Sequence, residues 1–111
     1  MLKKDYRLPL SKEKDFKNSF STNLITIKTS INTLSHNRFA TIISKKIDRR
    51  SVIRNKLRRM IDICIREESS NLRSGYDILF IVKKNFIRKA DRDIRESVRA
   101  CFEKLNLINY G

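Results

Sequence analysis

The chain has 111 residues and a formal net charge of +14, from 26 basic and 12 acidic side chains. This length permits one domain, and the 40% of apolar residues suffices for one modest core. The apolar runs fall far short of the roughly 18 residues of a membrane span, and no apolar signal core is present, so we expect a cytoplasmic protein. Because so small a body with this charge repels itself, nucleic acid is the favoured partner.

Residue types that usually carry catalysis are sparse. Cys64 and Cys101 lie 37 positions apart, His36 is the only histidine, and the C-x2-C pairs of structural zinc sites are absent. The only glycines are Gly75 and Gly111, which excludes a P-loop and a dinucleotide-binding loop. We therefore expect two buried thiols, no metal site and no catalytic residue in the chain itself.

The N-terminal segment predicts a basic arm over residues 1–10, followed by a short helix. Ser11 is a typical N-cap, and acidic side chains follow in the first turn, where the helix dipole favours them. We therefore expect a helix over residues 12–19. Phe16 and Phe20 are four positions apart, so they would share one face of it.

Two strands joined by a turn at residues 32–37 are expected next. In residues 24–31 isoleucines alternate with polar residues, which is the pattern of a half-buried strand. The isoleucines on its expected buried side are Ile25, Ile27 and Ile31. Residues 38–44 are rich in β-prone side chains, and we expect them to form a strand antiparallel to the first.

The strongest signal is a long amphipathic helix over residues 49–68. Its apolar stripe consists of Val52, Ile53, Leu57, Met60, Ile61 and Cys64. From Arg49 to Arg66, seven basic residues stand against one acid, Asp62. A solvated helix face usually mixes both signs of charge. Because this face does not, we expect it to bind a polyanion.

The last third predicts a strand and a helix. Residues 76–82 are apolar on both faces, which indicates a buried central or parallel strand. A final helix is expected over residues 89–105. Its core stripe consists of Ile94, Val98, Cys101, Phe102 and Leu105. The order of elements predicts one α+β domain over residues 1–111, a small sandwich of helices stacked on a mainly antiparallel sheet.

Three blocks of the sequence share one family resemblance. The most specific is Arg54-Asn55-Lys56-Leu57-Arg58-Arg59, which follows Ser44-Lys45-Lys46. Arg7-Leu8, Asp15-Phe16 and Phe20 form an earlier block, and Tyr76-Asp77-Ile78 a later one. In this order and spacing they resemble the protein subunit of bacterial ribonuclease P, whose signature reads Arg-Asn-Arg/Lys-x-Lys/Arg-Arg.

This resemblance implies that the chain itself cleaves nothing. In that family a large RNA subunit is the catalyst, and Mg2+ at the RNA active site is used to release the 5′ leader of precursor tRNA. The protein binds the catalytic RNA and contacts the leader. The implied fold is ribosomal-protein-like, with a left-handed β-α-β crossover around helix 49–68, although about 98% of such crossovers are right-handed.

The resemblance also implies two sets of contact residues. Contact with the catalytic RNA is expected at Lys45, Lys46, Arg49, Arg50, Arg54, Asn55, Lys56, Arg58 and Arg59. Contact with the leader is expected at Phe16, Lys17, Phe20 and Lys28. The rings of Phe16 and Phe20 either stack on bases or belong to the core. Guanidinium groups donate paired hydrogen bonds to phosphate, and Arg54, Arg58 and Asp62 form one ridge at four-residue spacing.

Other interpretations stay open. A ribosomal or other structural RNA-binding protein without a role in tRNA processing fits the composition and the basic helix equally well. Binding to DNA is not expected, because helix-turn-helix spacing and dimerisation heptads are missing. The chain also departs from the family pattern. Asp48 replaces a frequent glycine, and no aromatic residue is found among the strand residues expected at the cleft, Thr26, Lys28 and Thr29.

Overall fold

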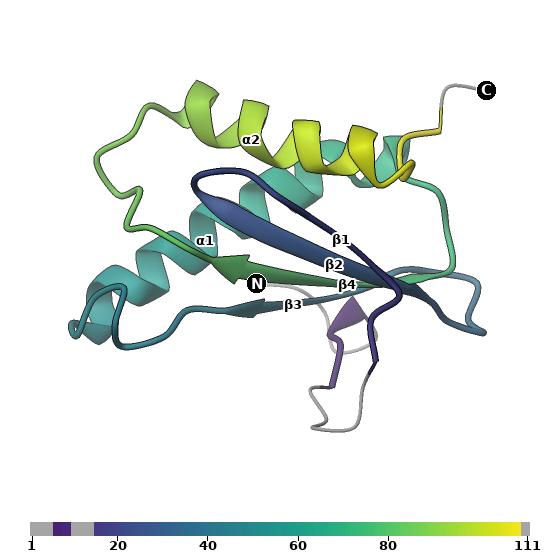
Figure 1. The fold of residues 1–111 in the computed structure, drawn as a ribbon, viewed down its shortest axis with the longest axis horizontal. Helices are drawn as coiled ribbons and strands as arrows, with labels where there is room; N and C mark the ends of the chain where they lie inside the picture. The colour runs from purple at the N-terminus through teal and green to yellow at the C-terminus, as the bar shows by residue number, and fades with distance from the viewer. Residues whose placement is uncertain (1–5, 10–14, 110–111) are drawn as a thin grey trace.

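The computed structural model describes residues 6–9 and 15–109. Within these residues, four strands form one sheet, and two α-helices cover one of its faces (Figure 1). In chain order the elements are β1 (Asn18–Ser21), β2 (Ile25–Ile31), β3 (Arg38–Ile42), α1 (Ser51–Glu68), a 3-10 turn (Ser69–Asn71), β4 (Tyr76–Val82) and α2 (Asp91–Lys104). The α+β architecture predicted from the order of elements is confirmed.

Strand β4 lies inside the sheet, whose strand order is β1-β2-β4-β3. It runs antiparallel to β2 and parallel to β3. Its sequence explains this place, because Ile78 and Phe80 are buried on the helix side while Leu79 is buried on the other side. The predicted buried strand at residues 76–82 is confirmed.

The predicted antiparallel pairing between residues 38–44 and residues 24–31 is wrong. Strand β4 lies between them. Because β4 has apolar side chains on both faces, it buries more apolar surface in the middle of the sheet than it would at an edge. The loop at residues 32–37 is instead tied to the start of β4. The Asn32 N–H donates to the carbonyl of Gly75, and the Tyr76 N–H donates to the Asn37 side chain. Gly75 has a φ of 89°, a conformation that favours glycine.

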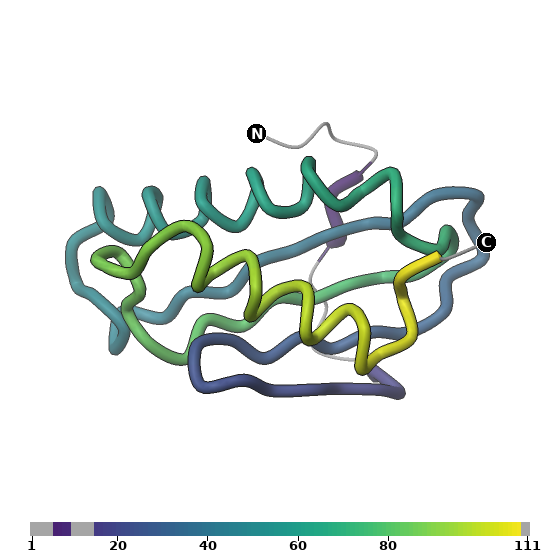
Figure 2. Tube along the Cα trace, turned by 90° about the horizontal axis from the view of Figure 1, so that it is seen from above, coloured from purple at the N-terminus to yellow at the C-terminus, as the bar shows by residue number. Residues whose placement is uncertain are grey.

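Helix α1 connects β3 to the parallel strand β4 by the left-handed crossover that the resemblance implies. Figure 2 views the sheet from the helix side. When that view is turned so that both strands point upward, β4 lies to the left of β3. This hand is the rare one for a β-α-β unit.

The predicted helix over residues 12–19 is wrong where the structure describes it. Residues 12–14, and residues 1–5 and 10 of the predicted arm, lie outside the described residues. Residues 18–21 form strand β1, in which Phe20 stands opposite Ile27 of β2. Helices this short are marginal without tertiary packing, so pairing with β2 outweighs the local helical pattern.

Both predicted long helices are confirmed to within two residues at each end. The buried residues are Leu57, Ile61, Cys64 and Ile65 on α1, and Ile94, Val98, Cys101 and Phe102 on α2. Two expected core positions are wrong. Val52 is 62% exposed because the first turn of α1 extends past the sheet (Figure 1), and Ile31 is 78% exposed at the end of β2.

Candidate nucleic-acid interface

The candidate interface begins in the loop before α1, where Asp48 organises the backbone. Its carboxylate accepts the main-chain N–H of Arg50 at 2.8 Å and the Arg50 guanidinium at 2.9 and 3.1 Å. The side-chain amide of Asn85 donates to the same carboxylate at 3.0 Å. These bonds, chiefly those from the Arg50 side chain, lower the pKa of Asp48 to about 2. Asp48 is therefore ionised at neutral pH and holds the loop in one shape.

Arg54, the first residue of the signature block, also holds this loop. Its Nη1 donates to the carbonyl of Asp48 at 2.9 Å and to that of Arg49 at 2.8 Å. The guanidinium thereby fixes the loop to the second turn of α1. Lys45 and Lys46, together with Arg49 and Arg50, remain exposed on the loop.

The rest of the signature block follows the helical period. Leu57 is fully buried, whereas Asn55, Lys56 and Arg59 are exposed. Arg58 is half-buried, and among the described residues its guanidinium makes one long contact, 3.4 Å from Nη1 to the Asn55 side chain. The structure thus brings the nine residues predicted to contact catalytic RNA into one stretch of loop and helix, with their cationic groups on the solvent side of the core.

The residues predicted to contact the leader are not brought onto one face of the sheet. Lys28 points away from the helices, because its neighbours Ile27 and Thr29 are buried on the helix side. Phe20 is opposite Ile27, so its ring packs against the core. Thr29, expected at the cleft, is only 1% exposed.

Phe16 and Lys17 directly precede β1. Phe16 is half-buried and Lys17 is exposed. Since Asn18 pairs with Thr29, both residues enter the sheet beside the second half of β2.

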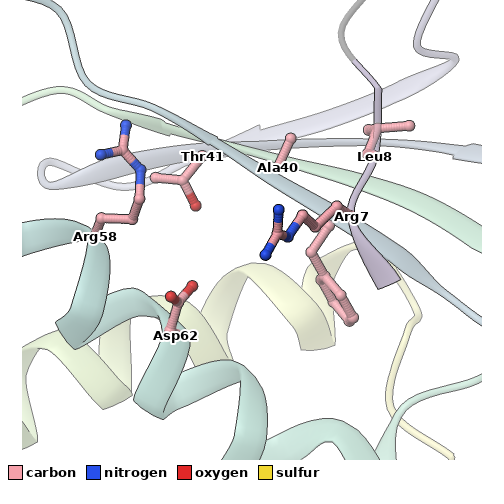
Figure 3. Close-up of a pocket in the computed structure, with 7 residues that line it drawn as sticks. Arg7, Leu8, Ala40, Thr41, Arg58 and Asp62 are labelled. Atoms are coloured by element: carbon pink, nitrogen blue, oxygen red, sulfur yellow. The ribbon is translucent and has the colours of Figure 1, made fainter. Parts of the chain in front are cut away.

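A hollow of about 300 Å³ opens between α1 and the edge of the sheet (Figure 3). We call it the α1–β3 hollow. It is lined by Arg7, Leu8, Phe39, Ala40, Thr41, Arg58 and Asp62. The Leu8 N–H donates to the carbonyl of Phe39 at 2.7 Å, which holds the N-terminal segment along β3. No sequence pattern places Arg7 opposite α1, although the ridge of Arg54, Arg58 and Asp62 identifies the helix face that lines the hollow.

Acidic side chains gather at the opposite end of α1. Arg95 of α2 pairs with Glu67 at 3.0 Å, and Arg99 pairs with Glu68 at 3.0 Å. These pairs join the two helices and offset positive charge there. The signature end of α1 has no comparable acids in its first turn. The basic surface is therefore one-sided.

Among residues 6–9 and 15–109, no group of three His, Cys, Asp or Glu side chains is placed to hold a metal ion. In the same part of the chain, no helix is long and apolar enough to cross a membrane. The fold and the one-sided surface define a class, a small α+β protein with a basic face of the kind that suits polyanions.

The comparisons with known proteins identify the family. A family model described as Ribonuclease P matches residues 3–106. The ribonuclease P protein component of Clostridium kluyveri is 34% identical over 91 residues, covering 80% of each chain. That of Alkaliphilus oremlandii is 29% identical over 105 residues, covering 95% of this chain and 88% of the relative. The chain belongs to the ribonuclease P protein family.

A solved structure has the same fold. The ribonuclease P protein of Staphylococcus aureus, in a mutant with defective mRNA degradation activity, superimposes with a TM-score of 0.82 at 22% identity. The match covers 95% of this chain and 92% of that chain. The fold of a small α+β domain with a mostly antiparallel sheet is therefore the fold of a known ribonuclease P protein.

Proposed function

We propose that this chain acts as the protein subunit of ribonuclease P, the ribonucleoprotein endoribonuclease that removes the 5′ leader of precursor tRNA. The observation that carries the proposal is the family match over residues 3–106. Composition alone favours a ribosomal protein equally, but the match spans almost the whole chain and includes the signature block. Its relatives are bacterial, which supports a cytoplasmic site of action, where bacterial tRNA precursors are made.

In this proposal the chain binds RNA as a single domain over residues 1–111, and the RNA subunit performs the cleavage. Mg2+ supplies the hydrolytic chemistry when bound at the RNA active site. The described residues offer cations and hydrogen-bond donors rather than a cluster of metal ligands. The protein contributes binding and orientation of the two RNA molecules.

Contact with the catalytic RNA is assigned to the loop and the first half of α1. The residues are Lys45, Lys46, Arg49, Arg50, Arg54, Asn55, Lys56, Arg58 and Arg59. Supporting this, the loop is held rigid by Asp48 and Arg54, so its exposed cations need not be ordered when RNA binds. Guanidinium groups suit phosphate because they donate two parallel hydrogen bonds.

Contact with the leader is assigned to Phe16, Lys17 and Lys28. The ring of Phe20, the fourth residue expected there, packs against the core on the other face of the sheet. Lys28 supports this assignment most directly, since it lies on the sheet face that the two helices leave open. Single-stranded RNA combines backbone contact to cations with stacking of bases on aromatic rings. Phe16, half-buried next to β1, offers such a ring.

Reconstitution tests the proposed function. We expect the protein to stimulate cleavage of precursor tRNA by a bacterial ribonuclease P RNA at low Mg2+, and RNA-free protein to cleave nothing. Arg59→Ala should weaken binding to that RNA more than Lys104→Ala, because both side chains are exposed but only Arg59 belongs to the signature block. Failure to stimulate cleavage, or equal losses in the two variants, would contradict the proposal.

A further inference from the structure

Asp62 is an acidic residue on the face of α1 that otherwise carries basic side chains. It follows Arg58 by one turn and continues the ridge that starts at Arg54. A surface that binds only phosphates gains nothing from a carboxylate at this place, because like charges repel. The acid therefore needs an explanation other than binding to the RNA backbone.

The carboxylate of Asp62 points into the α1–β3 hollow (Figure 3). Burial raises the pKa of this carboxyl, although the positive charges of the N-terminal amine, Arg66 and Arg58 oppose the effect. The described residues place no ion pair on it within 4 Å, in contrast to Glu67 and Glu68 farther along the same helix. A half-buried carboxylate that accepts no hydrogen bond from the described residues can accept hydrogen bonds from a ligand in the hollow.

The rest of the hollow is suited to a flat, mostly apolar group with a nearby anion. Leu8, Phe39 and Ala40 supply apolar surface, and Thr41 supplies a hydroxyl. Arg7 and Arg58 line the hollow from opposite sides; the Arg7 guanidinium extends into it, and that of Arg58 extends toward the sheet beside Thr41 (Figure 3). Guanidinium planes stack on bases and also bind phosphates.

Base chemistry selects the ligand. A carboxylate accepts two parallel hydrogen bonds, and among the four RNA bases only guanine offers two adjacent donors, N1–H and the N2 amine, on its Watson–Crick edge. Adenine and cytosine present one exocyclic amine, and uracil presents one ring N–H. Sequence-specific recognition of unpaired RNA commonly uses such edges.

We propose that the α1–β3 hollow binds an unpaired guanine of the bound RNA, with the Asp62 carboxylate accepting from its Watson–Crick edge. Arg58 and Arg7 contact the base plane or the flanking phosphates. The inference deepens the proposed RNA-binding function and rests on it. Binding at this hollow would make the protein selective for one base, although its affinity for RNA is otherwise mainly electrostatic.

Short RNAs bound to the full-length protein provide the test. The probes are heptauridylates whose central base is replaced by guanine, adenine or hypoxanthine, measured by fluorescence anisotropy at low salt. We expect the guanine probe to bind about fivefold or more tightly than the adenine probe, the range of one good bidentate base contact. The hypoxanthine probe lacks the N2 amine and should lose most of this advantage.

Two variants control for charge. Asp62→Asn keeps the size of the side chain but replaces one acceptor oxygen by a donor, so the preference for guanine should disappear. Glu96→Gln removes the same charge from a side chain on α2 that is 71% exposed, and it should keep the preference. Both variants should bind the all-uridine probe slightly more tightly, since each raises the net charge. Melting temperatures close to that of the wild type would verify that both fold.

The inference is overturned if the wild type shows no preference for guanine, or if Asp62→Asn retains it. Free GMP competing as strongly as the guanine heptamer would also overturn it, because the site would then serve a free nucleotide. Reconstituted cleavage separates this result from the proposed function. A protein that stimulates cleavage without a guanine preference keeps its function and loses only the subsite.

Discussion

At the scale of single residues, Phe20 has two possible roles that the structure distinguishes. The ring packs against the core, and the carbonyl of the same residue accepts the Cys101 thiol at 3.9 Å. Its strand partner Ile27 has no exposed surface. The contacts therefore favour a structural role for the ring over base stacking.

We expect Phe20→Ala to lower the free energy of unfolding by about 2 to 4 kcal/mol, less than a fully buried Phe would, because the ring is only partly buried. Binding of precursor and mature tRNA by the holoenzyme should change by the same factor. Melting temperatures and the two affinities, measured on one variant, check this. Weaker precursor binding alone, at unchanged stability, would show that the ring stacks on the leader.

The two cysteines are free and buried, as predicted. Burial raises the pKa of Cys64 and of Cys101 to about 11, from an ordinary value near 9. Both thiols are consequently protonated in the folded protein at neutral pH. Since the thiolate is the reactive form, both should be inert in the folded state.

We expect a disulfide reagent at pH 8 to modify the two thiols of the folded protein only as fast as the protein unfolds locally or globally. The thiols of the unfolded protein should react at once. Stability should also fall as pH rises from about 9 toward 11. In that window unfolded thiols ionise, whereas folded thiols stay protonated until the pH passes their raised pKa. A Cys64→Ala, Cys101→Ala double variant should lose this part of the pH dependence. Rapid labelling of the folded protein would show that the thiols are accessible.

At the scale of elements, the loop before α1 and the helix behave as one unit because Arg54 joins them. A lysine at this position keeps the charge but loses the planar fork that reaches two carbonyls. Arg58 makes no comparable pair of bonds to the backbone of the described residues. The two arginines of the signature block thus have different structural surroundings.

We expect Arg54→Lys to weaken binding to the catalytic RNA several-fold, and Arg58→Lys to weaken it less. The dependence of log K on log salt should keep its slope in both variants, since neither changes the number of charges. Affinities measured over a salt series provide the check. If Arg54→Lys binds as the wild type does, the loop is held by other contacts.

The sequence predicts those helices and strands in which apolar residues recur at regular spacing over a long run. Helices α1 and α2 and strand β4 could be predicted because each carries a sustained apolar pattern. Strand β1 could not, because its four residues are mostly polar and owe their conformation to pairing with β2. The parallel pairing of β3 depends on β4, whose partner residues lie 39 positions away.

The same limit applies to polar groups. Asp77 interrupts an apolar strand and is fully buried, a placement that would be costly without partners. Arg38 donates to both of its carboxylate oxygens at 2.9 Å, and Asn32 donates to one of them at 2.9 Å. The basic face of α1 could be predicted from its charge pattern. The α1–β3 hollow could not, because Arg7 and Asp62 come together only in the folded chain.

At the scale of the whole molecule, charge is distributed unevenly along the sequence. Residues 1–60 hold sixteen basic and four acidic side chains, and residues 61–111 hold ten and eight. The ion pairs between α1 and α2 lie in the balanced half. Excess positive charge is therefore concentrated in the part that includes the candidate interface, and it opposes compaction when no RNA is bound.

Added NaCl should raise the melting temperature of the isolated protein, because screening relieves this repulsion. The same salt should weaken binding to the catalytic RNA, with log K falling linearly against log salt. Calorimetry and a salt series of binding measurements test the two halves of the prediction. A melting temperature that falls with salt would indicate that ion pairs such as Arg99 with Glu68 outweigh the repulsion.

The central place of β4 has a consequence for synthesis of the chain. Strands β2 and β3 both hydrogen-bond to β4, which is made more than thirty residues after β3. A nascent chain that ends before Tyr76 has only the β1–β2 hairpin of this sheet available to it, and such a two-stranded ribbon is marginally stable at best. The basic loop before α1 and the first half of α1 therefore leave the ribosome before β4 can pair with β2 and β3 to complete the sheet.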